Sequence, residues 1–308
     1  VLSSAPDVVH INGLLFPELI RSVRASLPRH VALVVQDHGG FDPSRASALT
    51  RVWLRRGLAA ADAVLIASAG QAEALRASGI APPETLIADV MESSTVLRGV
   101  PREHARAELH MHGDPALLWV GRLNDNKDPI TVLAGVAAFF AHHPNATLTM
   151  AFQGGELDSA VRAAIHRDAY LNARVSLVGA IPHDRLATYY SAADIFILGS
   201  RHEGSGYAAL EALACGCVPV ITDIAPFRAL TGDGAVGELW TPGRADACTS
   251  ALQRAWSRPA PQSRDAARQR FERQFSWPQI GARAGAIYRD VIAARDRARS
   301  ATRSHSTR

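Results

Sequence analysis

Short apolar runs alternate with helically spaced segments along the first third of the chain. The runs end in polar or small residues, as at Asp37-His38-Gly39-Gly40, and the segments between them repeat apolar residues every three or four positions. This alternation predicts parallel strands joined by helices. The expected strands are Asp7–Ile11, Val31–Gln36, Ala63–Ala67 and Thr85–Ala88, and the expected helices are Leu15–Leu27, Ala46–Ala60 and Gln71–Ser78.

A second alternating series follows a charged connection, Pro101–Asp114, and we place a domain boundary near Gly113. The fold class is therefore α/β, with two Rossmann-like parallel-sheet domains whose ligands gather at the carboxyl ends of strands. The expected strands are Ala116–Val120, Ala146–Phe152, Val175–Val178, Ile195–Leu198 and Cys217–Ile221. The expected helices are Pro129–His142, Leu157–Tyr170, Asp184–Ala192, Tyr207–Cys215, Ala245–Trp256 and, broken at Trp277-Pro278, Gln262–Ala294.

Length and charge narrow the class of protein. A chain of 308 residues fits about two domains. The formal net charge is +4, and the tail Arg295–Arg308, with five Arg and one Asp, accounts for +4 by itself. The remainder is near neutral and gives no argument for nucleic acid. The Ser/Arg-rich tail is expected to be disordered and solvated, with contact to an anionic membrane as the alternative.

Cysteine usage and hydropathy add two exclusions. Cys215, Cys217 and Cys248 offer neither a disulfide framework nor paired metal-ligand spacing. No apolar run reaches transmembrane length. The chain starts at Val1, inside what reads as a domain, so we expect an upstream segment and leave a targeting signal open. We expect a cytoplasmic protein, with peripheral contact at the inner membrane face as a further option.

The stretch from Ser200 to Thr222 combines a glycine-broken polar loop, a short apolar helix and a strand. Glu211 lies among alanines and leucines, where an unpaired carboxylate is costly to bury, so it must face water, a partner or a ligand. Gly204 and Gly206 leave backbone N–H groups at the helix N-terminus, which favours an anion. In the sequence, Glu203 precedes this helix N-terminus and Glu211 follows it. The plain alternative is a loop–helix–strand unit with a surface Glu.

A second constellation follows the strand that ends at Gly121. The segment Gly121-Arg122-Leu123 leads to Lys127-Asp128-Pro129, and Lys127 is the single lysine in a chain whose other basic residues are arginines. An arginine can donate two parallel hydrogen bonds to phosphate oxygens, and a lysine offers a compact positive charge. Both kinds of contact stabilise the negative charge of a leaving diphosphate. The alternative is a basic pair on the surface.

These motifs resemble family 4 of the retaining nucleotide-sugar glycosyltransferases, which have the two-domain GT-B fold. The matching features are the E-x7-E signature at Glu203 and Glu211 and the Gly-Arg-Leu-x3-Lys motif. The resemblance implies that a nucleoside-diphosphate sugar binds mainly to the C-terminal domain. It also implies transfer to an acceptor hydroxyl by front-face substitution, with the leaving phosphate taking the acceptor proton.

The resemblance also implies roles for individual residues. Glu203 faces the donor sugar as a catalytic residue, together with His38 of the N-terminal domain. The donor diphosphate is held by Arg122, Lys127, Gly206 and Tyr207, the sugar loop is Gly204-Ser205, and Glu211 accepts hydrogen bonds from the ribose. The base contacts are expected at Ala180, Ile181 and Pro182.

The same resemblance divides the chain into a partial acceptor-side domain (1–112), a donor domain (113–274), a helix that crosses back (275–294) and the tail (295–308). By this resemblance we expect the start of the acceptor-side domain to be missing upstream of Val1, so whether this chain is active alone is left open. No Asp-x-Asp pair occurs, so no metal and no cofactor is expected. The expected partners are the donor and an unidentified glycan, lipid or small-molecule acceptor, without nucleic acid.

Three rival functions stay open at this stage. The first is a sugar-nucleotide-binding protein without turnover, or an inactive fragment. The second is a GT-B sugar-nucleotide epimerase, which explains the E-x7-E stretch less well. The third, a nicotinamide dehydrogenase, is weak because no expected strand is followed by a full Gly-x-Gly-x-x-Gly.

Overall fold

The computed structural model describes residues 6–38, 41, 43, 46–258 and 260–306. The chain forms two compact units. Residues 1–92 and 277–308 make unit 1, and residues 93–276 make unit 2. Each unit contains one sheet of parallel strands, which confirms the expected α/β class.

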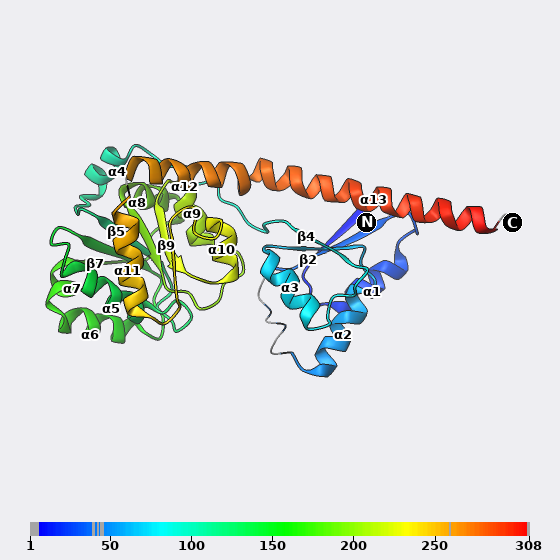
Figure 1. Ribbon diagram of the computed structural model, residues 1–308, viewed down its shortest axis with the longest axis horizontal. Coiled ribbons are helices and arrows are strands. Elements are labelled where there is room, and N and C mark those ends of the chain that lie inside the picture. Colours follow the sequence, from blue (N-terminus) through cyan, green and yellow to red (C-terminus); the bar gives the residue numbers. More distant parts are fainter. Residues whose placement is uncertain (1–5, 39–40, 42, 44–45, 259, 307–308) are drawn as a thin grey trace. The chain divides into compact units, whose positions relative to one another are not determined.

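Unit 1 is built on a four-stranded parallel sheet with the order β1-β2-β3-β4. Helices α1, α2 and α3 lie on one side of this sheet and the long helix α13 lies on the other (Figure 1). The strands are β1 (Val8–Asn12), β2 (Ala32–Gln36), β3 (Ala63–Ile66) and β4 (Leu86–Asp89). The helices are α1 (Pro17–Ser26), α2 (Ala48–Leu58), α3 (Ala69–Ala77) and α13 (Trp277–Ser306).

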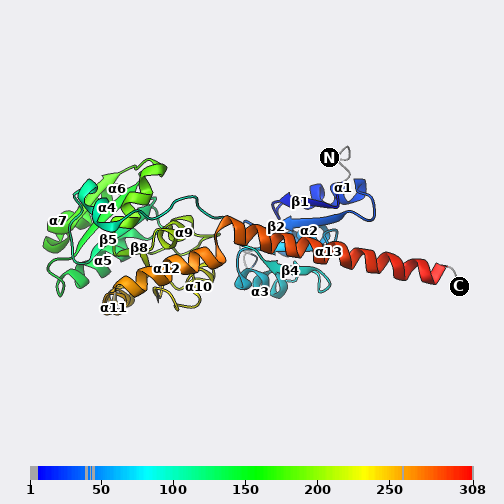
Figure 2. The ribbon, with the colours of Figure 1, turned by 90° about the horizontal axis from the view of Figure 1, so that it is seen from above.

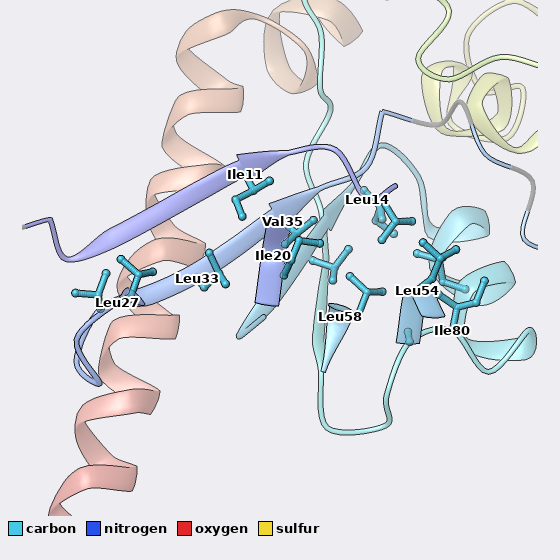
Figure 3. Packing of buried hydrophobic residues seen from close by; sticks show 14 residues of the cluster. Ile11, Leu14, Ile20, Leu27, Leu33, Val35, Leu54, Leu58 and Ile80 are labelled. Atoms are coloured by element: carbon cyan, nitrogen blue, oxygen red, sulfur yellow. The ribbon is translucent and has the colours of Figure 1, made fainter. Parts of the chain in front are cut away.

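Strand β2 shows why both faces of this sheet need cover. All five of its residues are buried, because successive side chains of a strand point to opposite faces. Leu33 and Val35 pack in the cluster that includes Ile20 of α1 and Leu54 of α2 (Figure 3). Ala32 and Val34 pack instead with apolar residues of α13, Ile287 and Val291 among them. Figure 2 shows α13 running alongside this sheet.

Unit 2 carries a six-stranded parallel sheet with the order β10-β9-β8-β5-β6-β7. The strands are β5 (Ala116–Gly121), β6 (Thr147–Phe152), β7 (Val175–Gly179), β8 (Ile195–Leu198), β9 (Val218–Thr222) and β10 (Glu238–Trp240). The helices are α4 (Arg102–Leu109), α5 (Pro129–Phe140), α6 (Asp158–Arg167), α7 (Ala169–Arg174), the 3₁₀ turn η3 (His183–Arg185), α8 (Leu186–Ala192), α9 (Tyr207–Ala214), α10 (Ala225–Thr231), α11 (Ala245–Trp256) and α12 (Ala260–Gln274).

The helix expected over Leu157–Tyr170 is two helices in the structure. Asp168 has an extended backbone between α6 and α7, and its carboxylate accepts hydrogen bonds from the N–H groups of Tyr170 and Leu171 at 2.9 and 3.0 Å. An acidic side chain that caps a helix start in this way ends the preceding helix and begins a new one.

The domain boundary expected near Gly113 lies earlier in the structure, between Glu92 and Ser93. The charged connection belongs to unit 2 because α4 packs against α8. Arg102 and Arg106 both pair with the buried carboxylate of Asp194, at 2.5 and 2.7 Å. The charged residues of this segment suggested a connection between domains, but two of them form ion pairs with a buried carboxylate inside unit 2.

The tail beyond Arg295 also differs from the expectation of disorder. Helix α13 continues without a break to Ser306. Arg295 itself pairs with Asp62 and donates a hydrogen bond to the carbonyl of Arg29. Among the residues that the structure describes, no helix is both long enough and apolar enough to span a membrane.

The three cysteines are free and buried. Burial raises the pKa of Cys215 to about 12, and burial likewise raises the pKa of Cys217 and of Cys248. The thiols therefore stay protonated at neutral pH and act as small core side chains rather than as nucleophiles.

Candidate active site

A cavity of about 340 Å³ opens at the carboxyl ends of β5 and β6 in unit 2. Strand β5 lies between β6 and β8. The strand order therefore reverses here, and such switch points are where ligands of parallel sheets bind. The cavity is lined by Val120, Gly121, Arg122, Lys127, Ala151, Phe152, Gln153, Ala180, Ile181, Leu186, Glu203, Tyr207, Ala208 and Glu211.

The loop that follows β5 is tied to the loop that follows β8. The side-chain amide of Asn126 donates to the carbonyl of His202 and accepts from the His202 N–H, both at 3.0 Å. The N–H of Arg201 donates to the Asn126 carbonyl at 2.8 Å. These bonds hold the two loops together and place Lys127 beside Glu203, although the two residues are far apart in sequence.

Lys127 and Glu203 form an ion pair at the edge of the cavity. The Lys127 side chain is 21% exposed and the Glu203 side chain 12% exposed, so water screens the pair only partly. Lys127 is followed by Asp128, whose carboxylate accepts from the Thr131 N–H at 3.3 Å and so caps α5. Pro129 then occupies the first turn of the helix. Lys127, the single lysine of the chain, thus lies on a fixed loop and faces the carboxylate of Glu203.

Arg122 is the second cation at the cavity. The residue is exposed and, within the described part of the chain, its guanidinium has no hydrogen-bond or ion-pair partner. Because Glu203 already balances Lys127, Arg122 leaves an uncompensated positive charge where a diphosphate is expected.

Glu211 projects from α9 and is 6% exposed, yet its carboxylate is not alone. It accepts a hydrogen bond from the buried hydroxyl of Tyr190 at 3.1 Å and lies 2.7 Å from Nε2 of His183. Burial and the neighbouring Glu211 carboxylate raise the pKa of Tyr190 well above its usual value, so the hydroxyl stays a donor. The Glu211 carboxylate therefore contacts two protein side chains and also lines the cavity. These contacts agree with the expectation that a carboxylate among apolar residues faces a partner, water or a ligand.

The remaining expected site residues divide between the cavity wall and its support. Ala180, Ile181 and Tyr207 line the cavity, whereas Pro182, Gly204, Ser205 and Gly206 are not among its lining residues. Gly206 is the N-cap residue just before α9, with φ +71°, and a Cβ there would lie 2.6 Å from Cε1 of Phe227. Only glycine accommodates both that backbone conformation and that contact. Ser205 is buried.

The turn Gln153-Gly154-Gly155 supports the loop after β5. The N–H of Leu123 donates to the Gly154 carbonyl at 3.0 Å, and the N–H of Leu157 donates to the Leu123 carbonyl at 2.9 Å. A Cβ at Gly155 would lie 2.1 Å from that Leu123 carbonyl oxygen. This turn fixes the path of the loop from Arg122 to Lys127.

We expect Gly155→Ala to weaken nucleoside diphosphate binding about tenfold, since a backbone shift of a few tenths of an ångström displaces charged contacts. Stability should fall by about 1–3 kcal/mol through strain at φ +145° and the clash. Calorimetric titration and thermal melting measure both effects. Gly154→Ala is the matched control, because its φ is +84° but no atom lies within 4 Å of the added Cβ. Equal losses of affinity in the two variants would contradict the supporting role of Gly155.

His38, the expected catalytic residue of the N-terminal domain, belongs to unit 1 and does not line the cavity of unit 2. Its Nδ1 lies 2.5 Å from the Glu92 carboxylate, and its side chain is 49% exposed. Nearby His10 lies 2.6 Å from the Tyr288 hydroxyl, and burial followed by the charge of His38 lowers the pKa of His10. Gly39 and Gly40 lie outside the described residues.

Sequence reasoning missed several residues of the cavity. His183 and Tyr190 hold Glu211, and Phe152 and Leu186 form part of the wall. His183 directly follows the expected base-contact segment, which is the one local signal that favoured it. Tyr190 lies in an apolar helix and reads as a core residue. Among the described residues, no three His, Cys, Asp or Glu side chains are grouped as metal ligands.

Two family models match the chain. Residues 101–273 match the model described as glycosyl transferases group 1, and residues 1–88 match a glycosyl transferase 4-like domain. The interval between the two matches contains the boundary between the structural units.

Curated relatives include the GDP-mannose:cellobiosyl-diphosphopolyprenol alpha-mannosyltransferase of Xanthomonas campestris, 30% identical over 253 residues that cover 80% of this chain and 64% of the relative. A glycogen synthase of Mycobacterium tuberculosis is 31% identical over 57% of this chain and 42% of its own length. The chain thus spans less than two thirds of these relatives.

Solved structures show the fold. Sucrose-phosphate synthase from Thermosynechococcus elongatus superposes with a TM-score of 0.71 at 24% identity, covering 94% of this chain and 74% of that one. HepE of Anabaena, solved in complex with UDP, superposes with a TM-score of 0.77 at 17% identity, covering 92% of this chain and 79% of its own.

Proposed function

Because this chain belongs to the group 1 glycosyltransferases and has the GT-B fold, we propose that it transfers a sugar from a nucleoside-diphosphate sugar to an acceptor hydroxyl with retention of configuration. The observation that carries this proposal is the cavity of unit 2, where Arg122, Lys127, Glu203 and Glu211 face one space at a strand-order switch. The activity is proposed for the protein that contains this chain.

In this proposal the diphosphate lies against Arg122 and Lys127. The acceptor oxygen attacks the anomeric carbon on the face that the phosphate leaves, and the bond from that carbon to the phosphate oxygen breaks. The leaving phosphate oxygen takes the acceptor proton, so the products are a glycoside and a nucleoside diphosphate. Positive side chains stabilise the charge that develops on the leaving group.

Glu203 and Glu211 have different parts in this proposal. Glu203, held by Lys127, faces the sugar and opposes positive charge on its ring. Glu211, oriented by Tyr190 and His183, accepts hydrogen bonds from the ribose hydroxyls. Because His183 has a side chain that is 64% exposed, ribose can replace it at the Glu211 carboxylate without leaving a buried group unpaired.

A panel of sugar nucleotides tests the proposal. GDP-mannose and UDP-sugars come first, because the Xanthomonas relative is named for the former and HepE was solved with UDP. A lipid-linked glycan, the acceptor class in that relative's name, belongs among the acceptors. Release of nucleoside diphosphate with an anomeric configuration retained in the product supports the proposal. Binding without turnover favours a non-catalytic binding protein, and conversion of the donor sugar without acceptor favours an epimerase.

We further propose that transfer needs no metal ion, since the chain has no Asp-x-Asp pair to bridge a metal to the diphosphate. The turnover rate is therefore expected to be the same with and without excess EDTA. A steady-state assay of nucleoside diphosphate release measures it. Loss of turnover in EDTA that Mg²⁺ or Mn²⁺ restores would contradict this expectation.

A further inference from the structure

Six large apolar side chains of unit 1 are exposed on helices α1 and α2 and on the residues just before α1. The exposed fractions are 44% for Leu15, 57% for Phe16, 51% for Leu19, 84% for Leu49, 50% for Val52 and 43% for Trp53. We call these residues the α1–α2 surface. Large apolar side chains that gather on one surface, unlike scattered ones, indicate a binding partner.

The spacing along α2 shows that this helix has two apolar faces. Leu54 and Leu58 are buried in the core of unit 1. Leu49, Val52, Trp53 and Arg56 recur at intervals of three and four and therefore share another face, which the core does not cover. A helix that needed only to cover the sheet would carry polar residues on that face.

Helices α1 and α2 pack against each other, so their exposed residues belong to one surface. The indole N–H of Trp53 donates to the Glu18 carboxylate of α1 at 3.1 Å. A Cβ at Gly57 would lie 2.4 Å from Cβ of Pro17, so the end of α2 touches the start of α1. Trp53 therefore lies at the contact between the two helices, with apolar residues on either side.

The surface is also cationic. Together the two helices contain five Arg and one Glu. Arg24 lies 3.6 Å from Asp62, so the helices and that acid together carry a net charge of +3. The acid on the helices, Glu18, lies 3.2 Å from Arg21. Arginines interleaved with Trp, Phe and Leu favour a layer that is anionic at its surface and apolar beneath it.

We propose that the α1–α2 surface docks on an anionic lipid bilayer, with its apolar side chains in the headgroup region and its arginines on lipid phosphates. A second copy of the chain is disfavoured as the occupant, because it would bring two surfaces of like charge together. The basic tail fits the role less well, since residues 293–308 contain no apolar side chain larger than alanine. The proposal is independent of glycosyl transfer.

Co-sedimentation of the full chain with phosphatidylcholine vesicles, with and without phosphatidylglycerol, tests the proposal. We expect binding to the anionic vesicles that weakens in high salt. Leu49→Gln with Val52→Gln should lower the partition coefficient about tenfold or more, through lost apolar insertion. Arg56→Ala should lower it about fivefold, as one cation is removed. Val96→Gln is the matched control, because Val96 is 75% exposed but lies in unit 2.

Four results would overturn the proposal. They are no binding of the parent chain to anionic vesicles, unchanged binding of the double variant, loss of binding on removal of residues 295–308 alone, and a parent dimer in sedimentation velocity that the double variant abolishes. Circular dichroism melts of the exposed-site variants should match the parent, which separates docking from unfolding. Lys127→Ala should keep full vesicle binding, so a failure of the proposed donor site stays distinguishable.

Discussion

Glu203→Gln is expected to lower kcat by about 100- to 1000-fold, the usual cost of losing one preorganised electrostatic contact. The carboxylate is 12% exposed and fixed by Lys127, so in the proposed role it would oppose charge at the sugar with little reorganisation. Glutamine keeps the shape but not the charge. Because the sugar is only one part of the donor, KM should change much less than kcat, and steady-state kinetics with the preferred donor separate the two.

Glu103→Gln serves as the control for this variant. Glu103 lies in the same unit on α4, with a side chain that is 87% exposed, and it does not line the cavity. Its removal should leave both kinetic constants unchanged. If Glu203→Gln turns over at the parent rate, the sugar-facing role of Glu203 is wrong.

Lys127→Ala is expected to weaken nucleoside diphosphate binding about ten- to hundredfold, the loss of one charge-assisted contact. Lys127→Arg should restore only part of the affinity, because a planar guanidinium group does not fit the place of a compact ammonium group without rearrangement. The melting temperature without ligand should change little, since both members of the Lys127–Glu203 pair border the open cavity. Calorimetric titration with UDP, GDP and ADP gives the affinities.

Arg56→Ala is the control for nucleotide binding, since Arg56 lies on α2 in unit 1. This variant should bind nucleoside diphosphate as the parent does and lose affinity only for anionic vesicles. Lys127→Ala should do the reverse. Parental diphosphate affinity in Lys127→Ala would rule out the diphosphate role, and the single lysine would then carry no functional meaning.

Much of the fold follows from local patterns. Val31–Gln36 and Ile195–Leu198 have the short, continuous apolar runs that predict buried strands, and both segments form strands of parallel sheets. The carboxyl ends of such strands converge by geometry, so the order of elements along the chain is enough to assign Arg122 and Glu203 to one site. The cavity brings these two residues together.

The partners of these residues could not be predicted, because they depend on long-range packing. Lys127 lies beside Glu203 because Asn126 is hydrogen-bonded to Arg201 and His202, and no spacing in the sequence encodes these bonds. Tyr190 contacts Glu211 because α8 and α9 pack together. The charged connection resembles a linker because its partner, Asp194, lies far along the chain.

Helix α13 has a consequence for the order in which the protein is made. The apolar face of the unit 1 sheet that contains Val34 and Leu65 is covered by Ile287 and Val291. These residues leave the ribosome after all of unit 2. Unit 2 can therefore complete its sheet during synthesis, whereas the strands of unit 1 are made before α13 and keep one apolar face open to solvent until it follows. A nascent chain stalled before α13 would expose that face to chaperones, and to other nascent chains.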